Sequence, residues 1–419
     1  MRRQRLLPLL VTALSLCAAV RPTTAQTPDT LLGITSLHPD SAGEKWVGTW
    51  GTAVQLTEPR NLPPAPGLAG NTLRQVVHVS QGGGRVRVRF SNLFGTSVVT
   101  LSAAHLATSL GDGAIDPATD HILTFGGAPG MTIPAGGAVT SDPIAFPLQP
   151  LSDVALTVQF GAISPDIITG HPGSRTTSYL VEGDAVSEPS LSGAARTDHW
   201  YIITGIDVVD DDAAAVVTLG NSITDGRGSG TNEQNRWPDE LARRLQADDR
   251  TQQVAVLNMG IGGNCVLRAC LGPAALARFE RDVLAQSGAR WLIVLEGVND
   301  IGGSNPDSSA MVAQNLIAAY QEMIERAHVR GIRVYGATIL PFGGSFYDSP
   351  AHEAARQTVN EWIRTSGAFD EVIDLDAALR DPENPTQLLP AADTGDHLHP
   401  NETGHRMMAE AVDLARFTR

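Results

Sequence analysis

Residues 213–226 read Ala-Ala-Ala-Val-Val-Thr-Leu-Gly-Asn-Ser-Ile-Thr-Asp-Gly and decide the fold of the second half of the chain. The apolar run at 215–219 is typical of a buried β-strand, and Ser222 follows it directly, just before a helical stretch. Parallel sheets build their sites at this edge, where strands end. Ser222 is therefore a candidate nucleophile, although serine at this point could equally be a helix N-cap.

Strands and helices alternate along the chain beyond this segment. This pattern predicts a parallel sheet covered by helices on both faces, within a domain spanning 213–419. The expected strands lie at 215–219, 254–258, 291–296, 332–339 and 371–375. The expected helices lie at about 235–247, 273–287, 310–330, 350–366 and 402–416.

The preceding part of the chain has a different pattern. Alternating apolar and polar residues at 85–90, 122–125 and 154–160 indicate strands, and Gly- and Pro-rich turns separate them. Many short strands without a helical stretch favour a β-sandwich of the jelly-roll kind over residues 45–210. The chain is therefore expected to form two domains.

The first 25 residues are typical of an export signal. Arg2, Arg3 and Arg5 precede an apolar run over residues 6–20, and we expect cleavage near Ala25. This run is shorter than the roughly 20 apolar residues that a spanning helix needs. The mature protein is therefore expected to be secreted, to the extracellular space or the periplasm.

Charge and cysteine content narrow the choice of partner and compartment. The net charge is −15 and Lys45 is the only lysine, a balance that argues against a nucleic-acid partner because such a partner needs clustered cations. In an oxidising compartment, Cys265 and Cys270 favour a short-loop disulfide over two unpaired thiols.

Three further segments follow expected strands or precede the last helix. Asn258-Met-Gly-Ile-Gly-Gly-Asn264 is a glycine-rich turn whose backbone can approach a ligand closely. The segment Glu296-Gly-Val-Asn-Asp300 places an amide side chain, Asn299, at the same sheet edge. Each of these two segments alone is equally typical of a loop without function.

A loop at 393–401 contains Asp396 three residues before His399. In a tight turn, such a carboxylate can accept a hydrogen bond from one imidazole nitrogen while the other nitrogen faces a nucleophile. The alternative is a metal loop built from His397, His399 and a carboxylate. No other cluster in the sequence has metal-ligand spacing, so we expect neither a metal nor another cofactor.

The nucleophile elbow of α/β-hydrolases would need glycine where this chain has Thr224. Instead, the four segments resemble in order and spacing the four signature blocks of the GDSL/SGNH hydrolase family, over about residues 213–417. The resemblance implies a flavodoxin-like α/β/α fold, and some secreted bacterial members carry a similar β-rich module before it. Two departures are Gly-Asn-Ser-Ile in place of Gly-Asp-Ser-Leu and His397 where glycine is common.

The resemblance also implies roles for five residues. Ser222 matches the nucleophile, and Asp396 with His399 matches the acid–base pair. The backbone N–H groups of Ser222 and Gly263 and the side chain of Asn299 match the oxyanion hole. The chain is therefore expected to be a carboxylic ester hydrolase.

The substrate is less constrained by the sequence. A short-chain acyl ester is favoured, and a carbohydrate O-deacetylase acting on extracellular polysaccharide is the alternative. A non-catalytic carbohydrate-binding protein and a metal-dependent phosphoesterase are the rivals from other classes. Five residues are candidates for the substrate-binding rim, with core packing as the alternative: Ile223, Leu267, Phe342, Phe346 and Tyr347.

Overall fold

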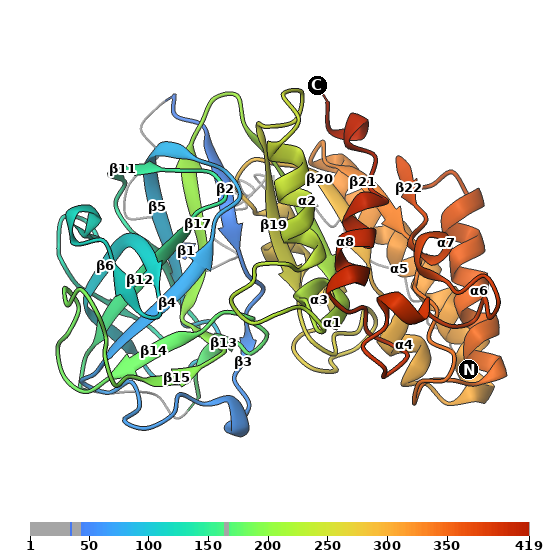
Figure 1. Ribbon diagram of the computed structural model, residues 1–419, viewed down its shortest axis with the longest axis horizontal. Coiled ribbons are helices and arrows are strands. Elements are labelled where there is room, and N and C mark those ends of the chain that lie inside the picture. The colour runs from blue at the N-terminus through green and yellow to red at the C-terminus, as the bar shows by residue number, and fades with distance from the viewer. Residues whose placement is uncertain (1–33, 36–42, 163–166, 419) are drawn as a thin grey trace, which may run out of the picture. The chain divides into compact units, whose positions relative to one another are not determined.

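Strand β18 (Ala214–Gly220) lies inside a five-stranded parallel sheet with the order β19-β18-β20-β21-β22 (Figure 1). Numbered along the sheet's own chain order, this is 2-1-3-4-5, the order of the flavodoxin-like fold that the resemblance implies. The other strands are β19 (Val254–Gly260), β20 (Ala289–Leu295), β21 (Arg333–Ala337) and β22 (Glu371–Ile373). The computed structural model describes residues 34–35, 43–162 and 167–418, so the expected export signal and its cleavage point near Ala25 lie outside the described residues.

Helices cover both faces of this sheet. Val217 and Leu219 point into a core shared with α3, α5 and α6, whereas Val216 points into a core shared with α2, α7 and α8. The expected three-layer arrangement is thereby confirmed. The helices are α1 (Ser222–Asp225), α2 (Trp237–Gln246), α3 (Ala275–Phe279), α4 (Val298–Gly302), α5 (Ser309–Val329), α6 (Pro350–Thr365), α7 (Leu375–Leu379) and α8 (Glu402–Glu410).

Two expected helices differ from those in the structure. The helix expected at 273–287 consists of α3 and a π-helical turn, Glu280–Leu284. The last helix ends at Glu410, and the Asp413 carboxylate then caps a separate 3₁₀ turn, Leu414–Phe417. Among the described residues, no helix is long and apolar enough to cross a membrane.

The preceding part of the chain is rich in strands, as expected. Most of its strand pairs are antiparallel, and most of its buried apolar residues form a core that includes Trp50 and Trp200, whose rings meet edge to face at 5.0 Å. Two smaller apolar clusters also occur in this part. The jelly-roll topology and the domain bounds 45–210 and 213–419 stay predictions. The strands are β1 (Ile34–Thr35), β2 (Trp46–Gly51), β3 (Gln55–Leu56), β4 (Thr72–His78), β5 (Gly83–Ser91), β6 (Val99–Gly111), β7 (Ala114–Ile115), β8 (His121–Ile122), β9 (Met131–Ile133), β10 (Ala138–Thr140), β11 (Ile144–Leu148), β12 (Asp153–Phe160), β13 (Thr169–His171), β14 (Ser178–Val181), β15 (Ala195–Thr197), β16 (Trp200–Tyr201) and β17 (Ile203–Val209).

The β-rich part packs directly against strand β19. A Cβ atom on Gly51 would lie 2.6 Å from the terminal methyl group of Met259, so with glycine here the Met259 side chain packs directly on the β2 backbone. Thr52 then forms a parallel bridge with Asn258. The end of β13 reaches α1 nearby, where His171 lies 2.8 Å from Asp225 (Figure 1).

Candidate active site

Ser222 is the first residue of α1 and lies where β18 ends. The helix N-cap is its neighbour Asn221, whose side chain accepts a hydrogen bond from the Ile223 N–H at 3.1 Å. The interpretation of Ser222 as an N-cap is therefore wrong. Its side chain is free for another bond, and its Oγ lies 2.9 Å from Nε2 of His399.

The loop before α8 holds His399 in this position. Asp396 Oδ2 accepts from Nδ1 of His399 at 2.7 Å, while its Oδ1 accepts from the His399 and Leu398 backbone N–H groups at 2.8 and 3.0 Å. Burial alone would raise the pKa of Asp396, but these hydrogen bonds lower it to about 2. Burial lowers the pKa of His399, and Asp396 opposes that effect. The ring is therefore neutral, and so able to act as a base, near pH 7.

Two predicted oxyanion-hole residues lie in neighbouring loops of the site. Gly263 has a φ of +69°, and a Cβ there would lie 2.8 Å from the Leu271 side chain. The amide nitrogen of Asn299 donates to the Asn264 carbonyl at 2.7 Å, while its oxygen accepts from the Tyr347 hydroxyl at 3.1 Å. These two bonds fix the plane of the Asn299 amide.

A buried arginine that the sequence analysis missed, Arg278, links the chain segments that follow β18 and β19. The Arg278 guanidinium donates to the carbonyls of Gly220 at 3.1 Å and Met259 at 2.7 Å, and to the side chain of Asn264 at 2.9 Å. It also lies 3.6 Å from Glu296, whose pKa burial raises to about 8 in spite of this arginine. No sequence motif marks Arg278, because its partners come from three different strand ends.

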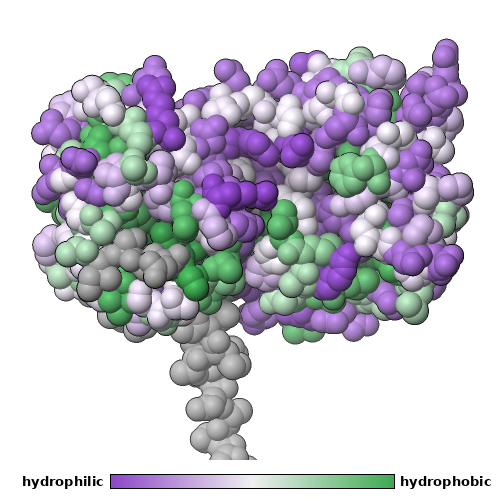
Figure 2. Space-filling view, turned by 90° about the horizontal axis from the view of Figure 1, so that it is seen from below, coloured by the Kyte–Doolittle hydropathy of each residue, from purple (hydrophilic) through white to green (hydrophobic). Residues whose placement is uncertain are grey.

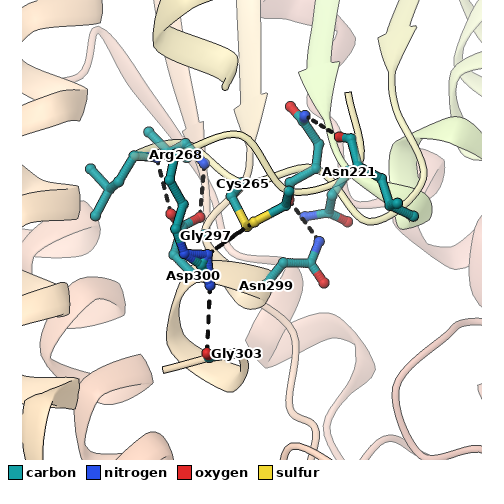
Figure 3. Close-up of a disulfide and its surroundings, with 12 residues drawn as sticks. Asn221, Cys265, Arg268, Gly297, Asn299, Asp300 and Gly303 are labelled. Carbon is teal, nitrogen blue, oxygen red and sulfur yellow. Dashed lines mark hydrogen bonds between the residues drawn. A yellow bond between two sulfur atoms is a disulfide. The ribbon is translucent and has the colours of Figure 1, made fainter. Parts of the chain in front are cut away.

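Cys265 and Cys270 form a disulfide, as the sequence favours (Figure 3). Figure 3 shows Arg268 reaching across it, with a nitrogen 3.0 Å from the Cys270 sulfur and another 3.5 Å from the Gly303 carbonyl. The Asp300 carboxylate accepts two backbone hydrogen bonds from the same loop, at 2.8 and 3.0 Å. The loop after Gly263 is thus held covalently and by hydrogen bonds.

Position 397, where the family often has glycine, takes a left-handed backbone conformation with a φ of +59°. Here His397 adopts it, and its ring pairs with Asp393 at 2.7 Å. Within the described part of the chain, no group of three or more His, Cys, Asp or Glu side chains could hold a metal ion.

Ser222, Asn299 and His399 line an open cavity of about 340 Å³. Figure 2 shows the face seen from below Figure 1, where hydrophilic and hydrophobic residues mix around a hollow. Two rim candidates, Phe346 and Tyr347, line this cavity.

The other three rim candidates do not line it. The prediction for Ile223 and Phe342 is wrong, because both are at most 2% exposed and belong to the two cores that flank the sheet. Leu267 packs against the edge of one core and is not among the residues that line the cavity.

The β-rich part supplies the opposite wall, which no sequence pattern indicated. Arg60 follows β3, His171 is the last residue of β13, and Arg175 follows that strand. His171 reaches Asp225 at the end of α1, which also lines the cavity. Asp225 ends a segment that was expected at the edge of the buried sheet, and a carboxylate there needs a hydrogen-bond partner. This was the one signal in the sequence that another segment packs against α1.

Comparison with known proteins agrees with this geometry. Residues 218–407 match the model of the GDSL-like lipase/acylhydrolase family. The match is confined to this stretch of the second half of the chain, and it points to a carboxylic ester hydrolase.

An acetylxylan esterase of Geobacillus stearothermophilus is 26% identical over 205 residues, which are 46% of this chain and 89% of that protein. The solved structure of a G-D-S-L family lipolytic protein from Desulfitobacterium hafniense is 22% identical, with a TM-score of 0.37, and covers 47% of this chain and 97% of that one. An acetyl xylan esterase structure from G. stearothermophilus is 24% identical, also with a TM-score of 0.37, and covers 47% and 92% respectively.

Proposed function

We propose that the protein is a secreted serine hydrolase that cleaves short-chain acyl esters through an acyl-enzyme on Ser222. The observation that carries the proposal is the unbroken hydrogen-bond chain from Ser222 Oγ through His399 to Asp396, at 2.9 and 2.7 Å, on the wall of an open cavity. A nucleophile, a base and an orienting carboxylate in this order are the arrangement that acyl transfer requires.

In the proposed reaction, His399 Nε2 takes the proton of Ser222 as Oγ attacks the ester carbonyl. Asp396 stabilises the imidazolium that forms. His399 then returns the proton to the leaving alcohol, which leaves the acyl group on Ser222. Water, deprotonated by the same histidine, attacks the acyl-enzyme and releases the carboxylic acid.

The negative charge on the carbonyl oxygen needs donors that are already in place. The Ser222 and Gly263 backbone N–H groups and the Asn299 amide are assigned this role. The Asn264 carbonyl and the Tyr347 hydroxyl already orient that amide, so the Asn299 side chain needs to move little during the reaction.

The test is hydrolysis of p-nitrophenyl acetate, butyrate and decanoate by the mature protein and by Ser222→Ala, with intact-mass analysis after phosphonate treatment. We expect preference for the short chains, and one phosphonyl adduct on the wild type only. Thr218→Ser, a change inside buried β18, serves as a matched control for handling and folding. A folded wild type with neither activity nor adduct would contradict the proposal.

A second candidate is O-deacetylation of a carbohydrate, favoured by the likeness to an acetylxylan esterase. Release of acetate from acetylated xylan, absent in Ser222→Ala, would support it.

Secretion is tested separately by N-terminal sequencing of protein recovered outside the cytoplasm, where we expect a start just after Ala25. The β-rich part is proposed to be an accessory domain of the jelly-roll kind.

A further inference from the structure

Three arginines line the cavity that contains Ser222: Arg60 from the 3₁₀ turn Pro59–Asn61, Arg175 from the segment after β13, and Arg227 just after α1. This concentration of positive charge is unusual in a chain whose net charge is −15. It lies at the place where a substrate must bind.

The acidic residues on the same cavity wall are already engaged. Glu58 accepts hydrogen bonds from the side chains of Gln55 and Asn61, both at 2.8 Å. Asp225 accepts from His171 at 2.8 Å. Both carboxylates keep their charge but are held by partners of their own, and Arg227 lies 3.9 Å from Asp396, whereas neither Arg60 nor Arg175 forms an ion pair within the described residues.

Arg175 is held in a conformation that only a specific environment would favour. Its φ of +52° lies in the left-handed region, and its carbonyl accepts from the Asn232 N–H at 2.9 Å. Its Nε is buried and has no hydrogen-bond partner within the described residues. The Arg175 side chain also lines the cavity, where a carboxylate is the partner that matches the geometry of a guanidinium.

The facing wall is aromatic. Phe346 is 76% exposed, and its ring lies against that of Tyr347 with centroids 4.3 Å apart. An exposed aromatic surface at a cavity rim indicates a binding role, because it is costly to leave in water. The apolar face of a sugar ring is a suitable occupant, since its hydroxyl groups remain free at the ring edge.

We propose that this cavity binds an O-acetylated glycan that bears uronic-acid carboxylates, with a carboxylate at Arg175 and Arg60 and a sugar ring on Phe346. The inference rests on the proposed esterase function and names the class of its substrate. The acetyl C–O bond breaks as Ser222 Oγ bonds to the acetyl carbon. The sugar hydroxyl leaves with the proton from His399, and water then releases acetic acid.

The test compares two polymers with the same backbone: acetylated polygalacturonate, and the same polymer with its carboxylates methyl-esterified. Acetate release is measured for the full-length mature protein. A charge-assisted pair at Arg175 is worth about a ten- to hundredfold preference in kcat/KM for the charged polymer. Added NaCl should reduce this preference, because it screens exposed charges.

Variants separate binding from chemistry. We expect Arg175→Gln to raise KM on the charged polymer about tenfold, and to reduce the preference for the charged over the neutral polymer by a similar factor. Arg175→Lys should restore part of the preference. Arg60→Gln, at an exposed position, tests the same subsite if Arg175→Gln fails to fold. Arg406→Gln, an arginine on α8 away from the cavity, is the control and should change nothing.

Equal activity of the wild type on both polymers, activity on neither, or an equal loss on both in Arg175→Gln and Arg60→Gln would overturn the subsite. Failure of the esterase proposal is distinct, because the wild type would then fail to hydrolyse p-nitrophenyl acetate as well.

Discussion

Nε2 of His171 lies 2.8 Å from Oδ1 of Asp225, and this bond joins the β-rich part to the helix that begins with Ser222. The other ring nitrogen faces the Ala53 carbonyl at 2.8 Å, and the ring stacks on Trp200. Both side chains of the pair are almost fully buried. Asp225 therefore depends on a residue more than 50 positions earlier for its partner.

Replacing His171 with Ala should leave the Asp225 carboxylate buried and unpaired. Removal of one member of a buried pair costs about 3 kcal/mol or more, so the free energy of unfolding should fall by that amount, measured by urea denaturation. Turnover should fall too, because α1 loses a fixed point beside Ser222. His171→Gln should recover part of both.

The control for this change is His328→Ala, which breaks an exposed pair with Asp370 and should cost less than about 1 kcal/mol. Equal effects of the two substitutions would show that burial of the His171 pair is unimportant.

Asn299→Ala should reduce kcat on p-nitrophenyl acetate about a hundred- to a thousandfold, because one oxyanion donor is lost. Tyr347→Phe keeps the ring but removes the hydroxyl that holds the Asn299 amide oxygen, so its effect on kcat should be smaller. An unchanged kcat in Asn299→Ala, with an unchanged melting temperature, would remove Asn299 from the oxyanion hole.

The dependence of activity on pH should report His399. The base must be neutral, and burial lowers its pKa, so kcat/KM should rise with pH along a limb whose midpoint lies below 6.5. Asp396 opposes this lowering. In Asp396→Asn the midpoint should therefore move further down, and kcat should fall by about 10⁴. A midpoint above 6.5 in the wild type would contradict the buried position of this ring.

The lowered pKa of Asp396 makes the stability of the fold depend on pH. Because its folded pKa is about 2 and its ordinary value is 3.8, the stabilisation is complete above about pH 4 and is lost as pH falls toward 2. Urea midpoints between pH 2 and 5 should thus drop less steeply in Asp396→Asn than in the wild type.

The disulfide should matter for turnover as well as for stability. Replacing both Cys265 and Cys270 with Ala removes a closed loop with a sequence separation of 5, worth about 2 kcal/mol of chain entropy. Turnover should fall because Leu271, just after the bridge, packs against Gly263. A thiol assay on the unfolded, unreduced protein should find no free sulfhydryl in the mature chain, and two would disprove the bridge.

The sequence predicts the α/β half well because its strands are continuous apolar runs and its chemistry follows strand ends. The spacing of Asp396 and His399 already indicates contact, and the resemblance to the GDSL/SGNH blocks implies that Ser222 joins them. The wall formed by Arg60 and Arg175 is different. Its residues lie in turns of the β-rich part, and their place depends on strand pairing far apart in the chain, which no local pattern encodes.

Core packing explains the wrong rim assignments. Phe342 follows strand β21 closely and its neighbour Phe346 is exposed, yet only the fold shows which of the two faces inward. The two residues are of the same type and lie in one loop, so only tertiary packing decides which side chain is buried and which is exposed.

The close approach of β2 to β19 through Gly51 has an evolutionary consequence. It adds a cavity wall from residues before 213 to the catalytic residues, which all follow residue 213. Mutations in the turns of the earlier stretch, with His171 kept, can then change which ester is accepted while Ser222 and His399 keep their geometry. A lineage carrying this architecture could acquire new specificities by drift in turns, with little risk to its chemistry.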